Sequence, residues 1–346
     1  MIEVIGILAT LFAGILADGL MQSPPDENRE DAGESGNEND GDQNPTNYGF
    51  MLTAGDDAGD DAGADDEGMP QSNDQPPPPD MGETLVGYDA ADVLFGEGGS
   101  DLVIGGAGDD SLGGRAGDDT MFGDFGEDEI IGGDGNDVLD GGSGNDLIYG
   151  ENGNDHLDGF TGDDQLYAGA GDDSLQGDDG RDQLFGGEGA DTIKGGAGND
   201  ALEGGIGDDN LMGGAGADEI FGDVGNDTLH GNSASLSDTS VDFLNGGAGD
   251  DVLMLGAGDY GQGDAGADTF TLTDFGTGGD AVQITDFDPA EDQLILLYDP
   301  ALGDAPAASL AQDAGGNTQI LLGGDVVATL TNGAQISLQD IILRAG

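Results

Sequence analysis

Residues 132–140 read Gly-Gly-Asp-Gly-Asn-Asp-Val-Leu-Asp, and this nine-residue pattern decides the fold. Sixteen consecutive units of the same length run without a gap from Gly87 to His230. The sixth position of the unit is Asp in all sixteen, and the eighth is always aliphatic or Met. The fourth is Gly in every unit except the first, where Ala90 stands. A repeat kept this strictly indicates a solenoid, in which similar units stack on one another.

Each position of the unit has a physical role. Glycine adopts backbone angles that other residues avoid, so the first six residues are expected to form a turn. The last three are expected to form a short strand, whose middle residue points inward because strand side chains alternate. Two units then make one flattened coil of two strands, with odd and even units in opposite sheets. Coils stack about 4.8 Å apart, and the eighth residues form a thin core.

The sixth-position Asp is the feature that needs an explanation. Stacking places the Asp of one unit over that of the unit two further on, as in Asp137 and Asp155. Carboxylates held this close repel strongly unless a cation lies between them. Ca²⁺ takes about six to eight oxygen ligands in flexible geometry, whereas Mg²⁺ demands a tighter octahedron. We therefore predict Ca²⁺ between the turns, at up to about fourteen positions, one for each pair of units two apart.

The regular pattern changes after His230. A fifteen-residue segment, 231–245, is followed by a regular unit, 246–254, and by eight residues, 255–262, in which Tyr260 stands where Asp is expected. A complete calcium site is therefore not expected around Tyr260. The predicted calcium ligands are Asp92, Asp101, Asp110, Asp119, Asp128, Asp137, Asp146, Asp155, Asp164, Asp173, Asp182, Asp191, Asp200, Asp209, Asp218, Asp227, Asp242, Asp251 and Asp268.

Two units, 132–140 and 195–203, match every fixed position of the RTX repeat, Gly-Gly-x-Gly-x-Asp-x-U-x, where U is a large apolar residue. The chain thus resembles the RTX (repeats-in-toxin, haemolysin-type) calcium-binding proteins. This resemblance implies a parallel β-roll with Ca²⁺ between its turns, and export by a type I system through an uncleaved C-terminal signal. Residues 284–289 and 291–294 resemble the segment that closes the roll in RTX proteases and lipases, and residues 340–343 resemble the ends of such chains.

The predicted fold is all-β, a parallel β-roll (β-solenoid) over 82–271 followed by a cap. In 272–346 glycine is less frequent and apolar residues alternate, which predicts a β-rich C-terminal cap that covers the last coil. This cap is also the expected secretion-signal region.

Two further zones precede the roll. Residues 21–81 are acidic and proline-rich with few apolar residues, which predicts a disordered linker. Residues 1–20 are apolar, but their uninterrupted run, 4–17, is shorter than the roughly 20 residues of a membrane span. A docking helix, a membrane anchor and an atypical signal peptide all remain open for this segment, and so does its contact with a membrane.

The composition restricts the partners. The chain has 74 Asp and Glu against 5 Lys and Arg, a formal charge of −69. Such a chain resists compaction without cations, and it has no basic cluster with which to bind nucleic acid. Cysteine is absent, so neither a disulfide nor a thiolate metal site can form.

No catalytic motif is recognisable. The two histidines, His156 and His230, are 74 positions apart, and no H-E-x-x-H, G-x-S-x-G or P-loop motif occurs. Asp pairs such as Asp109-Asp110 recur with the repeat, which indicates ligands rather than acid–base pairs.

We expect a non-enzymatic extracellular protein that folds on binding Ca²⁺. The alternatives are a structural or adhesive component of a surface layer or biofilm matrix, and a secreted hydrolase or toxin.

The ninth position distinguishes the two sheets. In odd units it is Phe95, Gly113, Ile131, Tyr149, Tyr167, Phe185, Glu203 and Phe221. In even units it is Ile104, Phe122, Asp140, Asp158, Gln176, Lys194, Met212 and His230. The first column is largely apolar, and we call it the Phe95–Phe221 face. Two interpretations remain open: packing between neighbouring strands, and a docking face for another copy, for residues 1–20 or for a surface polymer.

Overall fold

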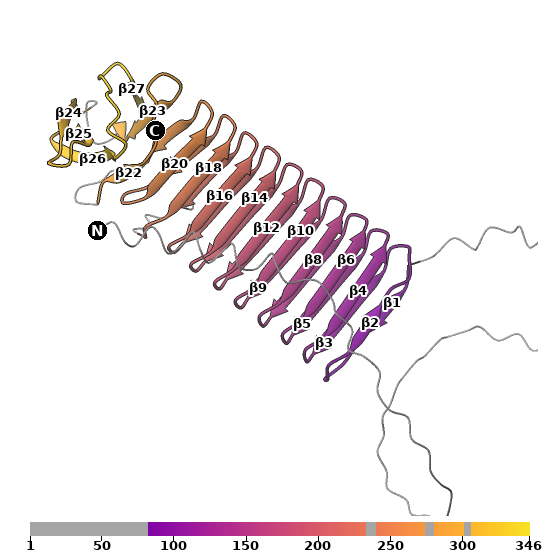
Figure 1. Cartoon of the computed structure of the whole chain (residues 1–346). Coiled ribbons are helices and arrows are strands. Elements are labelled where there is room, and N and C mark those ends of the chain that lie inside the picture. The colour runs from indigo at the N-terminus through magenta and orange to yellow at the C-terminus, as the bar shows by residue number, and fades with distance from the viewer. Residues whose placement is uncertain (1–81, 233–239, 274–279, 301–305) are drawn as a thin grey trace, which may run out of the picture. The chain divides into compact units, whose positions relative to one another are not determined.

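The computed structural model describes residues 82–232, 240–273, 280–300 and 306–346. The predicted apolar segment, 1–20, and the predicted linker, 21–81, lie outside the described residues. The described residues form a stack of flattened coils made of two sheets, with a further group of strands at the C-terminal end (Figure 1). The predicted all-β parallel β-roll is confirmed.

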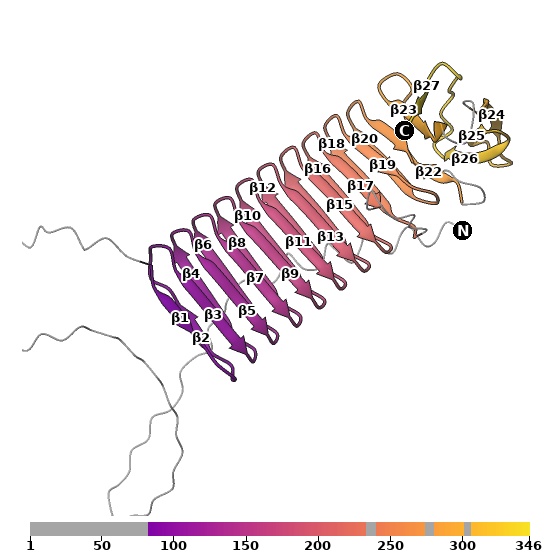
Figure 2. The ribbon, with the colours of Figure 1, turned by 180° about the vertical axis from the view of Figure 1, so that it is seen from behind.

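The first sheet has thirteen strands, seen from behind in Figure 2. In spatial order they are β1 (Thr84–Val86), β3 (Leu102–Ala107), β5 (Thr120–Phe125), β7 (Val138–Ser143), β9 (His156–Thr161), β11 (Ser174–Asp179), β13 (Thr192–Ala197), β15 (Asn210–Ala215), β17 (Thr228–Asn232), β19 (Val252–Leu255), β21 (Thr269–Leu272), β23 (Gln293–Tyr298) and β27 (Ile341–Ala345).

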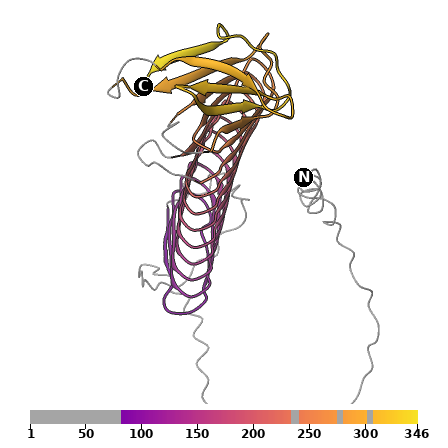
Figure 3. The same ribbon diagram turned by 90° about the vertical axis from the view of Figure 1, so that its left-hand side faces the viewer.

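The second sheet has fourteen strands, and the coils that join the two sheets are seen end-on in Figure 3. In spatial order they are β2 (Val93–Phe95), β4 (Ser111–Ala116), β6 (Glu129–Asp134), β8 (Leu147–Asn152), β10 (Gln165–Ala170), β12 (Gln183–Glu188), β14 (Ala201–Ile206), β16 (Glu219–Val224), β18 (Phe243–Ala248), β20 (Tyr260–Ala265), β22 (Val282–Ile284), β26 (Asp325–Leu330), β25 (Thr318–Leu322) and β24 (Ala308–Gln312).

The register follows the repeat. Leu166 pairs with Ile148 on one side and with Leu184 on the other, each eighteen residues away, in parallel strands. All three side chains are 0% exposed, so the eighth position forms the core as predicted. The strands are longer than predicted, because a typical strand joins the last three residues of one unit to the first three of the next. The glycines at the start of a unit therefore pair within the sheet, and only the middle of the unit turns.

The fourth-position glycine is required by the spacing of the coils. Gly144 has φ +145°, and a Cβ added there would overlap the carbonyl oxygen of Gly126 one coil earlier. The same contact recurs between Gly162 and Gly144. Ala90, the exception in the sequence, lies in the first coil of the described residues, where no earlier turn is present for its side chain to meet.

The irregular segment keeps the stacking intact. Leu244 pairs with Ile220 although the two are 24 residues apart, so the extra residues are accommodated between strands β17 and β18. In the next coil of this sheet Gly261 stands opposite Leu244, in the eighth position. The Leu255 side chain fills the space that Gly261 leaves, since a Cβ on Gly261 would lie 2.6 Å from its Cδ1. The core thus continues to the end of the roll.

The C-terminal strands extend both sheets rather than forming a separate layer. Strand β23 pairs in parallel with β21, and β26 pairs in parallel with β22. Strand β25 then pairs antiparallel with β26, and β24 pairs antiparallel with β25. Phe287 is 1% exposed and its ring centroid lies 5.9 Å from that of Phe270, the last aromatic residue of the roll core. The Asp286 carboxylate accepts the backbone N–H groups of Gly263 and Asp264 at 3.1 and 2.7 Å. These contacts cover the last coil.

The Phe95–Phe221 face lies on the second sheet, and its aromatic rings stack on one another. Ring centroids are 5.1 Å apart for Tyr149 and Tyr167, and 4.7 Å apart for Tyr167 and Phe185, with interplanar angles of 14° and 3°. The ring faces are therefore covered by neighbouring rings, which supports the interpretation as packing between strands. The docking face stays a prediction.

Replacing Gly144 with Ala tests the close approach of the coils. Because a whole turn must move and the backbone must keep a left-handed angle, we expect a loss of at least about 2 kcal/mol of stability. The neighbouring Ser143→Ala is the matched control, with a change of less than about 0.5 kcal/mol. Thermal unfolding in excess Ca²⁺, followed by circular dichroism, measures both. Equal effects of the two substitutions would contradict this account.

Candidate calcium sites

The sixth-position aspartates form two columns, one along each edge at which the coils turn. One column contains Asp92, Asp110, Asp128, Asp146, Asp164, Asp182, Asp200, Asp218 and Asp242. The other contains Asp101, Asp119, Asp137, Asp155, Asp173, Asp191, Asp209, Asp227, Asp251 and Asp268. Apart from the half-buried Asp92, none is more than 3% exposed. The structure thus brings all of the predicted ligands into columns, while their binding of Ca²⁺ stays a prediction.

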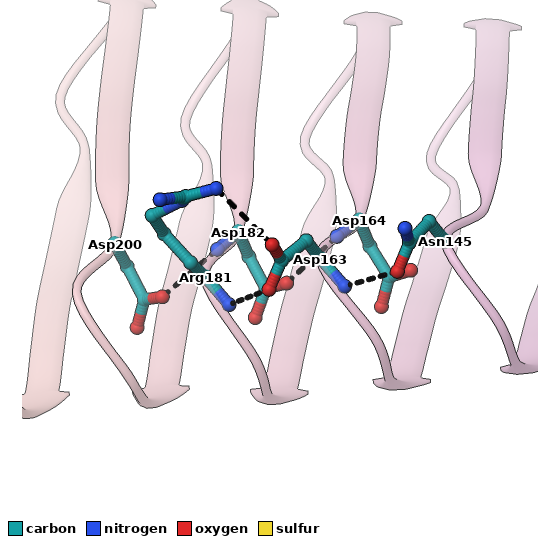
Figure 4. Close-up of polar contacts among 6 residues, drawn as sticks. All are labelled: Asn145, Asp163, Asp164, Arg181, Asp182 and Asp200. Atoms are coloured by element: carbon teal, nitrogen blue, oxygen red, sulfur yellow. Dashed lines mark hydrogen bonds and ion pairs between the residues drawn. The ribbon is translucent and has the colours of Figure 1, made fainter.

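From Asp101 onward, one oxygen of each carboxylate accepts a backbone N–H of the preceding coil. The N–H of Asp164 donates to Oδ1 of Asp182 at 2.9 Å, and the N–H of Asp182 donates to Oδ1 of Asp200 at 3.0 Å (Figure 4). The same bond runs from Glu83 to Asp101 at the beginning of the roll. This ladder was not predicted, and it offsets part of the repulsion between stacked carboxylates.

The second oxygen is buried without a partner at most positions. A buried carboxylate oxygen with no hydrogen bond costs free energy unless a proton or a cation satisfies it. Oδ2 has no hydrogen-bond partner in Asp101, Asp110, Asp119, Asp128, Asp137, Asp146, Asp155, Asp164, Asp173, Asp182, Asp191, Asp200, Asp209, Asp227 and Asp251.

These oxygens point to the space beside the first-position glycine. A Cβ added to Gly177 would meet both Oδ2 of Asp182 and the carbonyl oxygen of Gly195. Carboxylate and carbonyl oxygens thus converge there, and oxygen is the donor that Ca²⁺ prefers. Within the described ranges no three carboxylate or imidazole groups gather around one point. Backbone carbonyls must therefore complete any calcium site, and the residues present fit this ion.

Burial makes these carboxylates weak acids. The pKa of Asp137 and Asp164 is raised to about 7, mainly by removal from water; the backbone N–H lowers it and the carboxylates above and below raise it, both by less. The same cause raises the pKa of Asp182 and Asp200 to about 6. Without a cation these carboxylates therefore take up protons as the pH falls through about 7 to 6, and a cation that binds there must displace the protons.

A second ladder, on the exterior, was missed by the sequence analysis. The fifth-position Asn145 accepts the N–H of Asp163 at 2.8 Å, and Asp163 accepts the N–H of Arg181 at 3.1 Å (Figure 4). Asp163 also forms an ion pair with the Arg181 guanidinium at 3.1 Å. In an Asp pair such as Asp163-Asp164, only the second residue is buried; the first binds the next turn. The two members of such a pair thus have different surroundings, and the interpretation of the pairs as ligands stays a prediction.

Two members of the columns were also missed. Asp259, 0% exposed, accepts the N–H of Asp242 at 3.0 Å. It therefore continues the column in the unit in which Tyr260 stands at the position expected for Asp. A search for the next Asp, rather than for a unit of nine residues, would have found Asp259. Asp292 accepts the N–H of Asp268 at 3.0 Å and ends the other column. In both residues Oδ2 accepts a local N–H, from Gly256 in Asp259 and from Asp288 in Asp292, whereas the expected lack of a complete site near Tyr260 stays a prediction.

Acid is expected to stabilise the metal-free roll. The pKa values of Asp137 and Asp164, about 7 in the roll, lie above the value of about 3.9 for an exposed Asp. The resulting stabilisation is complete below about pH 4 and is lost as the pH rises to about 7. In EDTA, far-UV circular dichroism should therefore show more β structure at pH 5 than at pH 7.5. With Ca²⁺ the trend reverses, and the calcium midpoint rises as the pH falls. A metal-free signal that does not depend on pH would contradict this assignment.

A comparison with protein families identifies the same repeat. A family model described as "RTX calcium-binding nonapeptide repeat (4 copies)" matches residues 80–112, 113–148, 140–175, 176–211, 203–234 and 238–261, which together are just over half of the chain. No curated protein matches. Among solved structures, the AlgE6R3 subunit of the Azotobacter vinelandii mannuronan C5-epimerase is 25% identical, with a TM-score of 0.24, over 43% of this chain and 80% of that one. The chain belongs to the family of RTX calcium-binding nonapeptide repeat proteins.

Proposed function

We propose that this protein is a secreted, non-enzymatic calcium-binding protein whose repeats fold into the roll when they bind Ca²⁺ outside the cell. The observation that carries this proposal is the buried Oδ2 atom without a hydrogen bond, which recurs at most positions of both columns. A single buried atom of this kind is a local irregularity. Its recurrence at the position that defines a calcium-binding repeat favours a ligand role for the whole set.

The charge of the chain supports coupling between folding and ion binding. Stacking the coils brings many carboxylates out of water, and each buried charge costs several kcal/mol unless it is compensated. The described residues contain few cations of their own, and the ion pairs of Arg115 with Glu97 and of Arg181 with Asp163 lie on the surface. Ca²⁺ bound only to the folded roll shifts the equilibrium toward folding. The chain is then unfolded at the low Ca²⁺ of a cytosol and folds after export.

Export by a type I system is part of the proposal and is supported by the family alone. Among the described residues, no helix has the length and the apolar character of a membrane span. A binding role is supported over acid–base catalysis because the recurring carboxylates are engaged with backbone N–H groups and are repeated along the whole roll.

Removing Ca²⁺ tests the coupling directly. In EGTA at pH 7.5 we expect a circular dichroism spectrum with little β structure, and in millimolar Ca²⁺ the spectrum of a β-roll, because the cation compensates the buried carboxylates. Equal β content under the two conditions would refute the proposal.

The substitution Asp182→Asn separates a ligand role from a merely structural one. Asn keeps an Oδ1 that can accept the N–H of Asp164 but removes a buried charge. We expect the Ca²⁺ concentration at the folding midpoint to rise at least about threefold, and the metal-free roll to gain about 1 kcal/mol. The matched control is Asp163→Asn, in which the exposed neighbour keeps its acceptor; it loses a surface ion pair with Arg181 and a charge near Asp182, so both quantities should change much less than in Asp182→Asn. Equal loss of stability with and without Ca²⁺ would show that Asp182 is only structural.

A further inference from the structure

The described residues contain three methionines, and two of them flank a histidine. Met212 on β15 pairs directly with His230 on β17, and His230 pairs directly with Met254 on β19. The third, Met121, is 0% exposed in the roll core. The other histidine, His156, has Val138 and Ser174 as its neighbours on the adjoining strands. The combination of thioether, imidazole and thioether is therefore confined to one place in the described structure.

These three side chains project from the outer face of the first sheet. Leu211, Leu229 and Leu253, which precede them, are 0% exposed in the core, and alternation along a strand turns the next residue outward. Each of the three outward residues is half-buried. Neighbouring strands lie about 4.8 Å apart, so the three donors lie within a strip about 10 Å long. Methionine has three rotatable side-chain bonds, so both sulfurs can lean toward the imidazole between them.

The donor set is soft. Thioether sulfur favours Cu(I) among the biological metals, imidazole is also a good copper ligand, and Ca²⁺ avoids both. Burial lowers the pKa of His230, which keeps the imidazole in the neutral form that binds metals. Because the chain has no cysteine, no thiolate competes for such an ion. The hard cation Ca²⁺ is thereby assigned to the turns of the roll, and the soft cation Cu(I) to the outer face of one sheet.

A further polar group lies on the same strand and on the same side as the imidazole. Asn232 follows His230 by two residues on β17, on the same side of the strand, and its Oδ1 is buried without a hydrogen-bond partner. Metal-bound histidines usually donate their remaining ring N–H to a carbonyl or carboxylate oxygen, which fixes the orientation of the ring. Oδ1 of Asn232 is an acceptor available for that role.

We propose that Met212, His230 and Met254 form a binding site for a single Cu(I) ion on the outer face of the first sheet. The assignment does not depend on how many calcium ions the turns hold. It requires only that β15, β17 and β19 stand in register, which excess Ca²⁺ secures in every experiment below.

The test is a competition for Cu(I) against bicinchoninate, without oxygen, with the full-length protein in excess Ca²⁺. Wild type should withdraw one ion that is held at least about tenfold more weakly in Met212→Leu, Met254→Leu and His230→Gln. Leu is close to Met in volume, so the roll should persist. The matched control, His156→Gln, replaces the other histidine and should retain the wild-type affinity.

Two results would overturn the proposal. One is equal affinity in wild type and in all three site variants, because the ion would then be bound by other donors of the chain. The other is an X-ray absorption spectrum of the wild-type protein with one Cu(I) that shows only nitrogen or oxygen ligands. The spectrum is measured on the unaltered chain, so it remains decisive if a variant fails to fold, which circular dichroism in Ca²⁺ reveals.

Discussion

The structure depends on the conflict between a buried carboxylate and the stacking of coils. A regular coil buries two eighth-position side chains, which favours stacking, and two sixth-position carboxylates, which opposes it. The backbone resolves half of the conflict, because each Oδ1 accepts an N–H from the neighbouring coil, as Asp182 does from Asp164. The other half is left at Oδ2, where neither a side chain nor the backbone supplies a donor at most positions. The buried Oδ2 atoms thus link the stability of the stacked coils to the protons or cations that can satisfy them.

The sequence predicts the coil well because three of its constraints are local and repeated. The period, the inward Leu or Ile and the column of Asp follow from alternation and stacking alone, and they hold at Leu166 and Asp182 alike. The sequence does not predict features that depend on which backbone groups remain unpaired. The exterior ladder at Asn145 and Asp163 uses N–H groups that are exposed only in the finished turn. Asp259 was missed because the chain shortens a turn to keep the carboxylate in its column, so that position in space is preserved while spacing in the sequence is not.

The two sheets differ in chemistry although they share one geometry. The second sheet carries stacked rings at Tyr149, Tyr167 and Phe185 on its outer side. At corresponding ninth positions the first sheet carries carboxylates, then Lys194, and then the Met212–His230–Met254 set. The core and the turns fix the coil, so the outward ninth position is free to vary. Specific binding by such a roll is therefore to be sought on its outer faces, and general cation binding in its turns.

The alternation of sheets has a consequence for how such a chain can lengthen or shorten. Because consecutive strands belong to opposite sheets, gain or loss of one nine-residue unit would move every later strand to the other sheet and divide each outward column in two. Gain or loss of eighteen residues leaves all columns continuous. The six additional residues of the segment 231–245 also leave the columns continuous, since Leu244 still lies beside Ile220. Evolution and engineering alike can therefore change the length of this roll by whole coils or through its loops. Gain or loss of a single unit would instead exchange the two faces for every later strand.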